Sequence, residues 1–404
     1  MRAAGFAWNK TGIHRICLYR RLKKGTKVEG LYSEIHKDTG ETKKDPESEP
    51  PWRLRVGITY NLKKNIPSEL PDAEAEFDDM DTIRAIQGAL ETAGFDAALY
   101  EATEELPVRL LQDRPDIVFN IAEGMAGRGR EAQVPAILNF MGIPFTGSDE
   151  TTMCVAMDKA LTKRLVASCG VNTPKYQVVR RGSSVPAELG TGLSWPVIIK
   201  PNTEGSSKGI SDLSIVGDSA ALRRVLAEKI NAYREDMLLE EFISGREFSV
   251  GILGNGNNLR IFPPMEIIFT DKTHRIYSYD VKRNFRQYVR YECPANIGAN
   301  LRKEIEDTAE TVYRVLECRD FARIDFRLSG GEPADLRSVP CRDPAEGIPA
   351  GQLFFIEINP LPGLAPGYSD FPLIAGFCGM DYTALIRNIL DSALTRYGLP
   401  QVVR

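Results

Sequence analysis

The sequence predicts an α/β protein in which a small, open and mainly parallel sheet comes first. From Arg53 onward, short apolar segments rich in β-branched residues alternate with amphipathic segments at helical spacing, which is the order that parallel α/β units produce. Beyond residue 175, strand-like segments dominate and helix-like segments lie further apart. The 404 residues, of which 43% are hydrophobic and 26% charged, suffice for two or three domains with cores of their own.

The first sheet is expected to use three strand-like segments, at residues 54–61, 97–102 and 116–122. Helices are expected at residues 79–93 and 131–141, followed by a short strand at 143–147. In the first helix, Ile83, Ile86 and Leu90 recur at the helical period, as one buried face requires. The loops at residues 61–76 and 122–130 follow strand ends, where the ligands of open parallel sheets bind.

The later elements begin with a single expected helix at residues 151–169. Strands with one helix, at residues 220–231, are expected over residues 175–250, and closing helices at residues 301–316 and 381–396. We therefore divide the chain into four parts: an N-terminal extension, an N-terminal α/β domain that binds substrate, a central subdomain and a C-terminal subdomain, at residues 1–52, 53–150, 151–250 and 251–404.

The N-terminal extension differs in composition from the rest of the chain. It combines basic runs with the polar tract HKDTGETKKDPESEPP, which is too poor in apolar residues to form a core. No long apolar run precedes a small-residue cleavage site, so the segment is a poor secretory signal. We expect a partly flexible appendage; an upstream start codon is the alternative interpretation.

Charge and composition exclude several classes of function. A net charge of −4 offers no footprint for nucleic acid or for an anionic membrane, and no apolar run of about eighteen residues would span a bilayer. The seven cysteines show no metal-binding spacing, which favours reduced thiols in a cytoplasmic protein. With only His14, His36 and His274 present, neither a zinc site nor a histidine triad is expected, and His274 is expected in a loop.

Two late apolar segments, ARIDFRL at residues 322–328 and FFIEINPLPG at residues 354–363, carry isolated polar residues. Because side chains alternate along a strand, Arg323 and Asp325 share one face, and Glu357 and Asn359 share one face. If the strands pair, three oxygen ligands of the kind that Mg²⁺ prefers lie beside a guanidinium. The alternative is a structural ion pair between Arg323 and a carboxylate.

A lysine-flanked loop follows the strand-like segment at residues 197–200, within VIIKPNTEGSSKGIS. Glycine and serine residues allow the backbone to approach a ligand closely, and successive N–H groups in such a loop bind anions. Lys200 and Lys208 add positive charge at both ends. The loop lacks Walker or dinucleotide spacing, so we expect it to bind phosphate in another way.

With these segments in view, the chain resembles the ATP-grasp superfamily and, within it, the D-alanine–D-alanine ligase family. The resemblance covers residues 55–399 and is carried by eight motifs in the family's order: IPFTGSD, MDKALTK, IIKPNTEGSSKG, LLEEFISGREFSV, YSYDVKRN, YECPA, ARIDFRL and IEINPLPGL. It implies an ATP-grasp fold preceded by an open, mainly parallel α/β domain. The central subdomain would then carry the phosphate-binding loop, and the C-terminal subdomain the catalytic and metal-binding residues.

The resemblance assigns residues to the nucleotide one by one. Lys159 and Lys200 match lysines that bind the phosphates of ATP, and residues 204–209 match the lid loop over the triphosphate. Within this loop, the residues expected to bind ATP are Glu204, Ser206 and Ser207. The residues expected around the base and ribose are Glu240, Phe242, Ile243 and Glu247.

The reacting centre is assigned in the same way. Lys282 matches the lysine that neutralises the transferred phosphate, and Arg323 with the N–H of Gly363 matches the groups that hold the oxyanion. Ser206 belongs to the catalytic set as well. The expected ligands of two Mg²⁺ ions, for which Mn²⁺ could substitute, are Asp325, Glu357 and Asn359.

The resemblance implies an ATP-dependent carboxylate–amine ligase that forms a dipeptide-like amide through an acyl phosphate, in a cytoplasmic homodimer. Its partners would be an amino acid or small carboxylic acid and an amine, without nucleic acid or membrane. Two alternatives remain open: a phosphotransferase or carboxylase of the ATP-grasp type, and a nucleotide-binding protein without turnover.

The departures from the family pattern concern the substrates. Glu76 aligns with the glutamate that binds the first amino group, Arg283 replaces a tyrosine, and Ser369 is expected to hold the second substrate's carboxylate. The segment NIAEGMAGRGRE adds Arg128 and Arg130, and Lys208 replaces a valine. These added cations suggest a larger or more acidic first substrate than D-alanine.

Overall fold

The computed structural model describes residues 53–400, apart from residues 69, 71, 184–187, 271–275 and 331–350. The expectations for residues 1–52 and for His274 lie outside the described residues. Within the described part, no helix has the length and apolar character that crossing a membrane requires.

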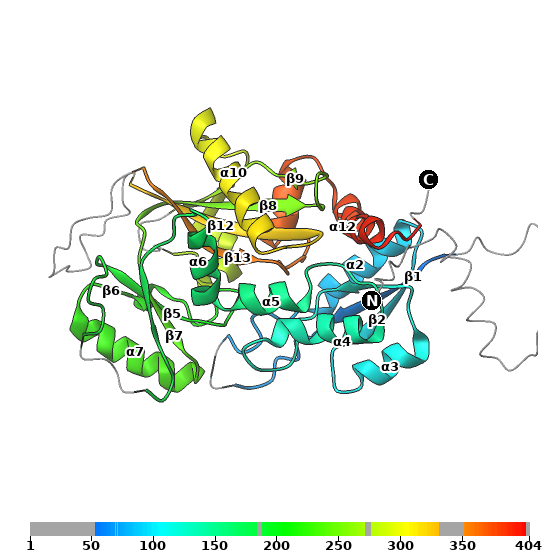
Figure 1. Cartoon of the computed structure of the whole chain (residues 1–404), viewed down its shortest axis with the longest axis horizontal. Coiled ribbons are helices and arrows are strands. Elements are labelled where there is room, and N and C mark those ends of the chain that lie inside the picture. Colours follow the sequence, from blue (N-terminus) through cyan, green and yellow to red (C-terminus); the bar gives the residue numbers. More distant parts are fainter. Residues whose placement is uncertain are drawn as a thin grey trace, which may run out of the picture. The chain divides into compact units, whose positions relative to one another are not determined.

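The N-terminal unit is a three-stranded parallel sheet in the order β2-β1-β3 (Figure 1). Its strands are β1 (Arg55–Tyr60), β2 (Asp96–Glu101) and β3 (Ile117–Asn120). Its helices are α2 (Met80–Thr92), α3 (Leu106–Asp113) and α4 (Gln133–Met141), the last preceded by the 3-10 turn η3 (Arg130–Ala132). The Asp79 carboxylate accepts from the Thr82 N–H and fixes the start of α2. The predicted parallel α/β unit is confirmed.

Two predicted elements in this region are wrong. The expected strand at residues 143–147 is reduced to one bridge between Phe145 and Val118. The expected helix at residues 151–169 is two helices, α5 (Glu150–Met157) and α6 (Lys159–Ser168). Asp158 separates them because its backbone is extended and its side chain accepts from the Leu161 N–H at 2.9 Å, so the residue caps a new helix.

The central sheet is antiparallel, with the order β4-β7-β5-β6. Its strands are β4 (Tyr176–Val179), β5 (Val197–Pro201), β6 (Ile215–Val216) and β7 (Met237–Glu241), and the turn η4 (Asp212–Ser214) leads into β6. Helix α7 (Ser219–Tyr233) covers one face and buries Leu222, Val225 and Leu226. The loop at residues 202–211, between β5 and η4, contains the predicted phosphate-binding residues.

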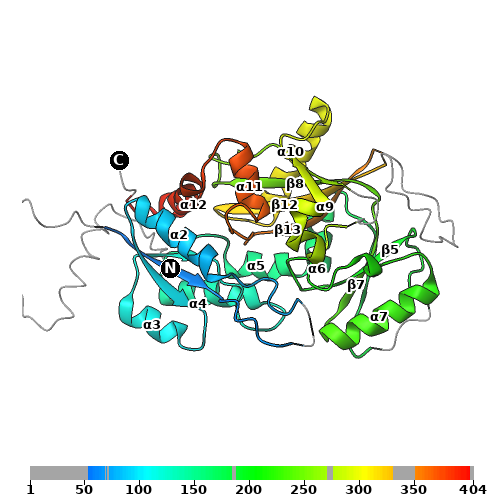
Figure 2. The same ribbon diagram turned by 180° about the vertical axis from the view of Figure 1, so that it is seen from behind.

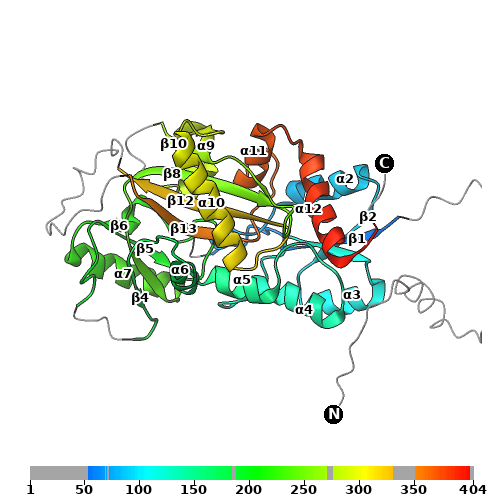
Figure 3. The same cartoon turned by 45° about the horizontal axis from the view of Figure 1, so that its top comes forward.

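The C-terminal sheet has the order β11-β10-β8-β12-β13, and β9 pairs with β8 outside this path. Its strands are β8 (Gly245–Leu253), β9 (Arg260–Ile261), β10 (Met265–Phe269), β11 (Val289–Glu292), β12 (Phe321–Ser329) and β13 (Leu353–Asn359). Helix α10 (Ala299–Val315) packs on this sheet (Figure 3). Because β8 pairs with β12 from Gly245 onward, residues 245–250 belong to this sheet and precede the boundary that we expected at residue 250.

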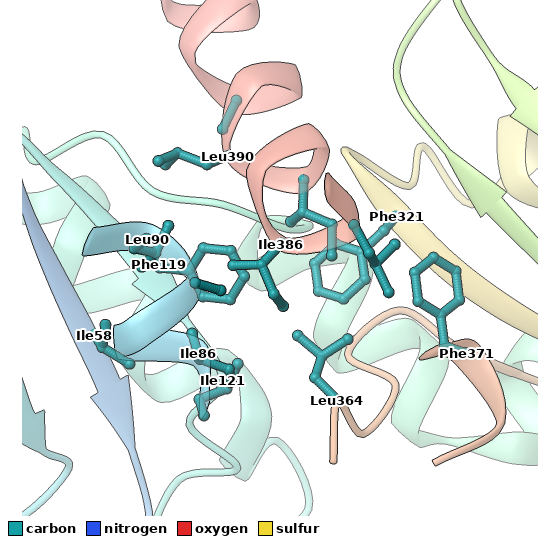
Figure 4. Close-up of a cluster of buried hydrophobic side chains, with 14 of the residues drawn as sticks. Ile58, Ile86, Leu90, Phe119, Ile121, Phe321, Leu364, Phe371, Ile386 and Leu390 are labelled. Carbon is teal, nitrogen blue, oxygen red and sulfur yellow. The ribbon is translucent and has the colours of Figure 1, made fainter. Parts of the chain in front are cut away.

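The last two helices connect the C-terminal sheet with the N-terminal unit. They are α11 (Asp370–Phe377) and α12 (Tyr382–Tyr397), and α12 contacts α2 (Figure 2). One buried cluster contains Ile58 of β1, Leu90 of α2, Ile386 of α12 and Phe371 of α11 (Figure 4). This shared core holds the carboxyl ends of the parallel strands close to the end of β13.

Candidate active site

Strands β12 and β13 pair as the sequence predicts. In this antiparallel ladder, Arg323 lies opposite Asn359 and Asp325 lies opposite Glu357. The four polar side chains therefore meet on one face, with the apolar residues of the same strands on the other. Helices α8 (Tyr279–Arg283) and α9 (Phe285–Tyr288) precede β11 at the opposite edge of the sheet, and α8 carries Lys282.

Arg323 forms the centre of a buried ionic group. It is 6% exposed, and its guanidinium donates to both oxygens of Asp325 at 2.9–3.2 Å. Asp370 of α11 lies 3.5 Å away on the other side, and the Ser249 hydroxyl of β8 donates to Asp325 at 2.6 Å. The ion pair considered as an alternative thus exists, within a group that still has carboxylate lone pairs to offer.

Glu357 lies in a strongly positive environment. Burial by itself would raise its pKa, but Lys159, Lys200, Lys282 and Arg323 outweigh burial and hold the pKa at about 2. Lys159 is the nearest of these with a measured contact, at 3.9 Å from the carboxylate. Glu357 is therefore ionised at every physiological pH, as a metal ligand must be.

A small inner cavity lies beside these strands. Its volume is about 90 Å³, and it is lined by Lys200, Ser207, Glu240, Phe242, Ile243, Glu247, Lys282, Asp325 and Glu357, among others. Small-molecule sites usually measure ~300–1,000 Å³, so this cavity is too small for a whole nucleotide. For a nucleotide to bind there, one wall of the cavity would have to move.

The loop that contains Ser207 forms part of the wall of this cavity. Its bonds to the rest of the protein include Gly205 N–H to Glu76 at 2.6 Å, Gly209 N–H to Asp72 at 2.7 Å, and the Ser207 hydroxyl to the carbonyl of Tyr277 at 2.9 Å. Ser206 and Ser207 also have positive φ angles of 48° and 57°, which residues other than glycine rarely adopt. The loop predicted to be a lid therefore lies against the inner cavity, which Ser207 lines.

Glu240 is held by two lysines. Its carboxylate lies 2.5 Å from the ammonium groups of both Lys163 and Lys200. Burial is the largest effect on Lys163, and together with the charge of Lys200 it lowers the pKa of Lys163 to about 8. Sequence reasoning missed Lys163, although its position four residues after Lys159 places both lysines on one face of α6.

Two further contacts of the inner cavity were missed. Arg327 donates to Glu247 at 2.9 Å and lies 4.7 Å over the ring of Phe242. Its position two residues after Asp325 is a signal in the sequence, because alternate residues of a strand share a face. The contact of Ser249 with Asp325 could not be found in this way, since it depends on the pairing of β8 with β12.

A larger outer cavity of about 520 Å³ lies toward the N-terminal unit. It is lined by Glu76, Ser206, Arg283, Arg323, Asn359, Gly363 and Ser369, together with residues discussed below. Tyr277, Lys282 and Asp370 line both cavities, so the cavities adjoin. The Tyr277 hydroxyl donates to the Asp370 carboxylate at 3.1 Å and bonds with the Tyr291 hydroxyl. Neither tyrosine was a predicted site residue.

The cations that suggested an acidic substrate are matched by carboxylates. Arg128 pairs with Asp158 at 2.6 Å, its side chain is 70% exposed, and it does not line the outer cavity. Arg130 pairs with Glu76 at 2.5 Å and with Glu204 at 3.0 Å, and Lys208 pairs with Glu204 at 2.8 Å. The premise that these three cations await an anionic substrate is wrong.

Lys159 and Glu204 line neither cavity. The Lys159 ammonium donates to the carbonyl of Glu204, so it lies beneath the lid loop. The Glu204 carboxylate, expected near the triphosphate, bonds with Arg130 and Lys208. Its partners hold the lid loop against the N-terminal unit.

Comparison with known proteins identifies the family. The chain is 31% identical over 310 residues to the D-alanine–D-alanine ligase of Geobacter sulfurreducens, which covers 76% of this chain and 87% of the relative. The chain belongs to the D-alanine–D-alanine ligase family. This family comprises ATP-dependent ligases, and the family prediction from the motifs is confirmed. A family model described as D-ala D-ala ligase C-terminus matches residues 165–335 of this family member.

Two further comparisons identify proteins that are similar to this family member in sequence or in fold. It is 32% identical over 321 residues to a Sinorhizobium fredii protein named uncharacterized protein y4sG, covering 78% of this chain and 87% of that protein. The crystal structure of D-alanine–D-alanine ligase from Bacillus anthracis complexed with ATP superimposes with a TM-score of 0.64 and 19% identity, covering 85% of this chain and 99% of that chain. The predicted ATP-grasp fold is confirmed.

Proposed function

We propose that this ligase joins the carboxylate of one amino acid or small carboxylic acid to the amine of a second substrate, through an acyl phosphate. The observation that carries the proposal is the register of β12 and β13, which aligns Asp325 with Glu357 and Arg323 with Asn359. This face borders two adjoining cavities. The inner one would take the nucleotide once the lid loop moves, and the outer one would take the amino acids.

The donor set fits magnesium. Asp325, Glu357 and Asn359 offer oxygen atoms without histidine or cysteine, as hard cations require, and Glu357 is ionised at all relevant pH values. When bound there, Mg²⁺ neutralises charge on the phosphates of ATP.

The lysines supply the remaining positive charge around the nucleotide. Lys200 and Lys282 line the inner cavity, and Lys159 lies 3.9 Å from Glu357; we assign all three to phosphate. Phe242 and Ile243 would contact the base, while Glu240 and Glu247 would accept from its amino group and from the ribose. Ser206 and Ser207 would close the lid over the phosphates, with N–H groups as donors.

The reaction needs no nucleophilic side chain. The first carboxylate attacks the γ-phosphate, which forms a P–O bond and releases ADP. The amine then attacks the acyl carbon, a C–N bond forms, a proton leaves the nitrogen, and phosphate departs with the C–O electron pair. Arg323 and the Gly363 N–H, both at the outer cavity, would hold the oxyanion; losing one such donor costs ~100- to 1,000-fold in rate.

Substrate contacts and assembly are part of the proposal. Glu76 would bind the first amino group, and Ser369 would hold the second carboxylate; both line the outer cavity. Arg283 lines the same cavity and would contact substrate or phosphate. The family resemblance supports a cytoplasmic homodimer, which sedimentation analysis of the purified chain would test.

The test is ATP-dependent phosphate release by the purified protein with D- and L-amino acids, with mass spectrometry of the products. Glu357→Gln should abolish amide formation, whereas Glu104→Gln, an exposed carboxylate on the N-terminal unit, should leave it unchanged. Phosphate transfer to an acceptor without amide formation would favour a phosphotransferase. Nucleotide binding without any ADP formation would favour the non-catalytic alternative.

A further inference from the structure

The outer cavity has an acidic end of which the proposed reaction uses only Glu76. Four carboxylates of the N-terminal unit line it there, namely Glu76, Asp78, Glu123 and Glu131, and we call this set the acidic end. The exposed carboxylates of Asp79 and Asp81 border the same cavity. Binding the amino group of an ordinary amino acid requires one carboxylate, so the acidic end holds more negative charge than such a substrate needs.

The carboxylates of Glu76, Glu123 and Glu131 are close together. One oxygen from each lies within 4.8 Å of the oxygens of the other two. Glu76 has partners, because Arg130 and the Gly205 N–H donate to it. Arg130 also pairs with Glu204, so this one guanidinium is shared among several carboxylates. Its attraction and that of Lys159 do not outweigh the burial of Glu131, and Asp78 has Lys63 as its neighbouring cation.

The position of Glu131 suggests that the cavity binds a cation. It is only 7% exposed and lines the cavity. Among the described residues, no hydrogen bond or ion pair to its carboxylate is found. A buried carboxylate without a donor carries a large desolvation cost, which a cation in the cavity would offset.

We propose that the outer cavity takes a first substrate that bears a second positive charge, a basic amino acid whose side-chain cation binds at the acidic end. This inference rests on the proposed ligase function and specifies its substrate class. Arg323 of β12 and Lys282 of α8 line the same cavity, as does Lys63 of the N-terminal unit, so the cavity presents groups of both charges to a substrate. A basic amino acid would place its carboxylate at the reacting centre and its side-chain cation between Glu123 and Glu131.

The titration behaviour of the acidic end agrees with this assignment. Burial first, and then the charge of Glu76, raises the pKa of Glu131 to about 7, against the lowering effect of Arg130 and Lys159. Burial and the charges of Glu131 and Glu76 also raise the pKa of Glu123, and burial with Asp79 raises that of Asp78 to about 7. A bound cation favours the ionised forms, so a basic substrate should bind more tightly as pH rises from 6 to 8.

An organic cation fits this cluster better than a divalent metal ion. Arg130 lies 2.5 Å from Glu76, and its guanidinium would repel a second concentrated charge. The cluster is also open to a cavity of about 520 Å³, far more room than a metal ion and its waters need, while an ammonium or guanidinium group can donate separately to each carboxylate.

The experiment compares three amino acids of similar length, ornithine, norleucine and glutamate, each as D and L isomers, with ATP and Mg²⁺ and a fixed amine acceptor. Ornithine should have the highest kcat/KM for amide formation. Glu131→Gln should reduce the preference for ornithine over norleucine by ~10- to 100-fold, and Glu123→Gln provides a second, independent variant. Glu104→Gln should leave the preference unchanged.

The outcomes separate this inference from the proposed function. Turnover with norleucine or glutamate exceeding that with ornithine would overturn the inference and leave the ligase function intact. Absence of amide with every amino acid would overturn the function itself. A third outcome would assign the acidic end to a metal ion instead of the substrate's cation. In that case calorimetry would show that MgCl₂ or CaCl₂ binds without ATP, Glu131→Gln would lose this binding, and the enzyme would not prefer ornithine. A preference for ornithine that grows from pH 6 to pH 8 would support the inference in the unmodified protein.

Discussion

Replacing Glu131 by glutamine should stabilise the unliganded protein, and the gain should grow with pH. Glu131 is buried, and burial with the charge of Glu76 outweighs the attraction of Arg130 and Lys159, so the substitution removes an ionised group that is destabilising on balance. Its pKa rises from an ordinary 4.5 to about 7 on folding. For a carboxyl with a raised pKa, the folded state binds the proton more tightly, and stability is lost as pH rises between these values.

The magnitude follows from this shift. Each pKa unit corresponds to about 1.4 kcal/mol, so at pH 8 the ionised Glu131 lowers the free energy of unfolding by ~3 kcal/mol. At pH 5 the carboxyl is protonated in the folded protein, and the penalty falls to ~1 kcal/mol. Glutamine has no such dependence. The difference in melting temperature between variant and unmodified protein should therefore be on the order of 5 °C at pH 8 and much smaller at pH 5.

Differential scanning fluorimetry of both proteins from pH 5 to pH 8 measures this difference. Glu104→Gln, which alters an exposed carboxylate, serves as control and should shift the melting temperature equally little at all pH values. A Glu131→Gln variant that melts below the unmodified protein at pH 8 would show that the carboxylate has a stabilising partner, and the reasoning about the acidic end would fail.

Three further predictions concern the nucleotide side. Glu357→Gln should abolish Mg²⁺-dependent ADP formation while the melting temperature stays within a few degrees, and undiminished turnover would remove the metal assignment. Backbone N–H groups of the lid loop, residues 203–209, should exchange hydrogen more slowly with ATP and Mg²⁺ than without them; equal exchange would argue against a phosphate lid. Lys163→Met leaves Glu240 with Lys200 alone and should lower the free energy of unfolding by ~1–3 kcal/mol. An unchanged melting temperature would mean that the buried pair of Lys163 and Glu240 contributes nothing to stability.

The fold and the reacting face could be predicted from local patterns. Alternation along β12 and β13 places Arg323 with Asp325 and Glu357 with Asn359 before any pairing is known, and the family motifs locate the lysines. The break at Asp158 was missed because helical spacing continues through it, and only its capping bond shows that a new helix begins.

The environment of the substrate cavity could not be read from the sequence. Arg130 meets Glu76 from 54 residues away and Glu204 from 74 residues away, so no local pattern reveals that its charge is matched. The same limit applies to Glu131, because its neighbours Glu76 and Glu123 are brought close to it only by the fold. Counting added cations therefore could not reveal that Arg130 and Lys208 are paired with carboxylates of the protein itself.

The most direct test of the proposed mechanism follows an oxygen atom. When the first amino acid carries ¹⁸O in its carboxylate, attack on the γ-phosphate places one labelled oxygen between carbon and phosphorus, and departure of phosphate carries that oxygen away. Mass spectrometry should find one ¹⁸O in each phosphate released with amide formation, and Glu357→Gln should release neither. Phosphate without label, formed alongside the amide, would contradict an acyl phosphate and with it the roles assigned to Arg323, Gly363 and the paired strands.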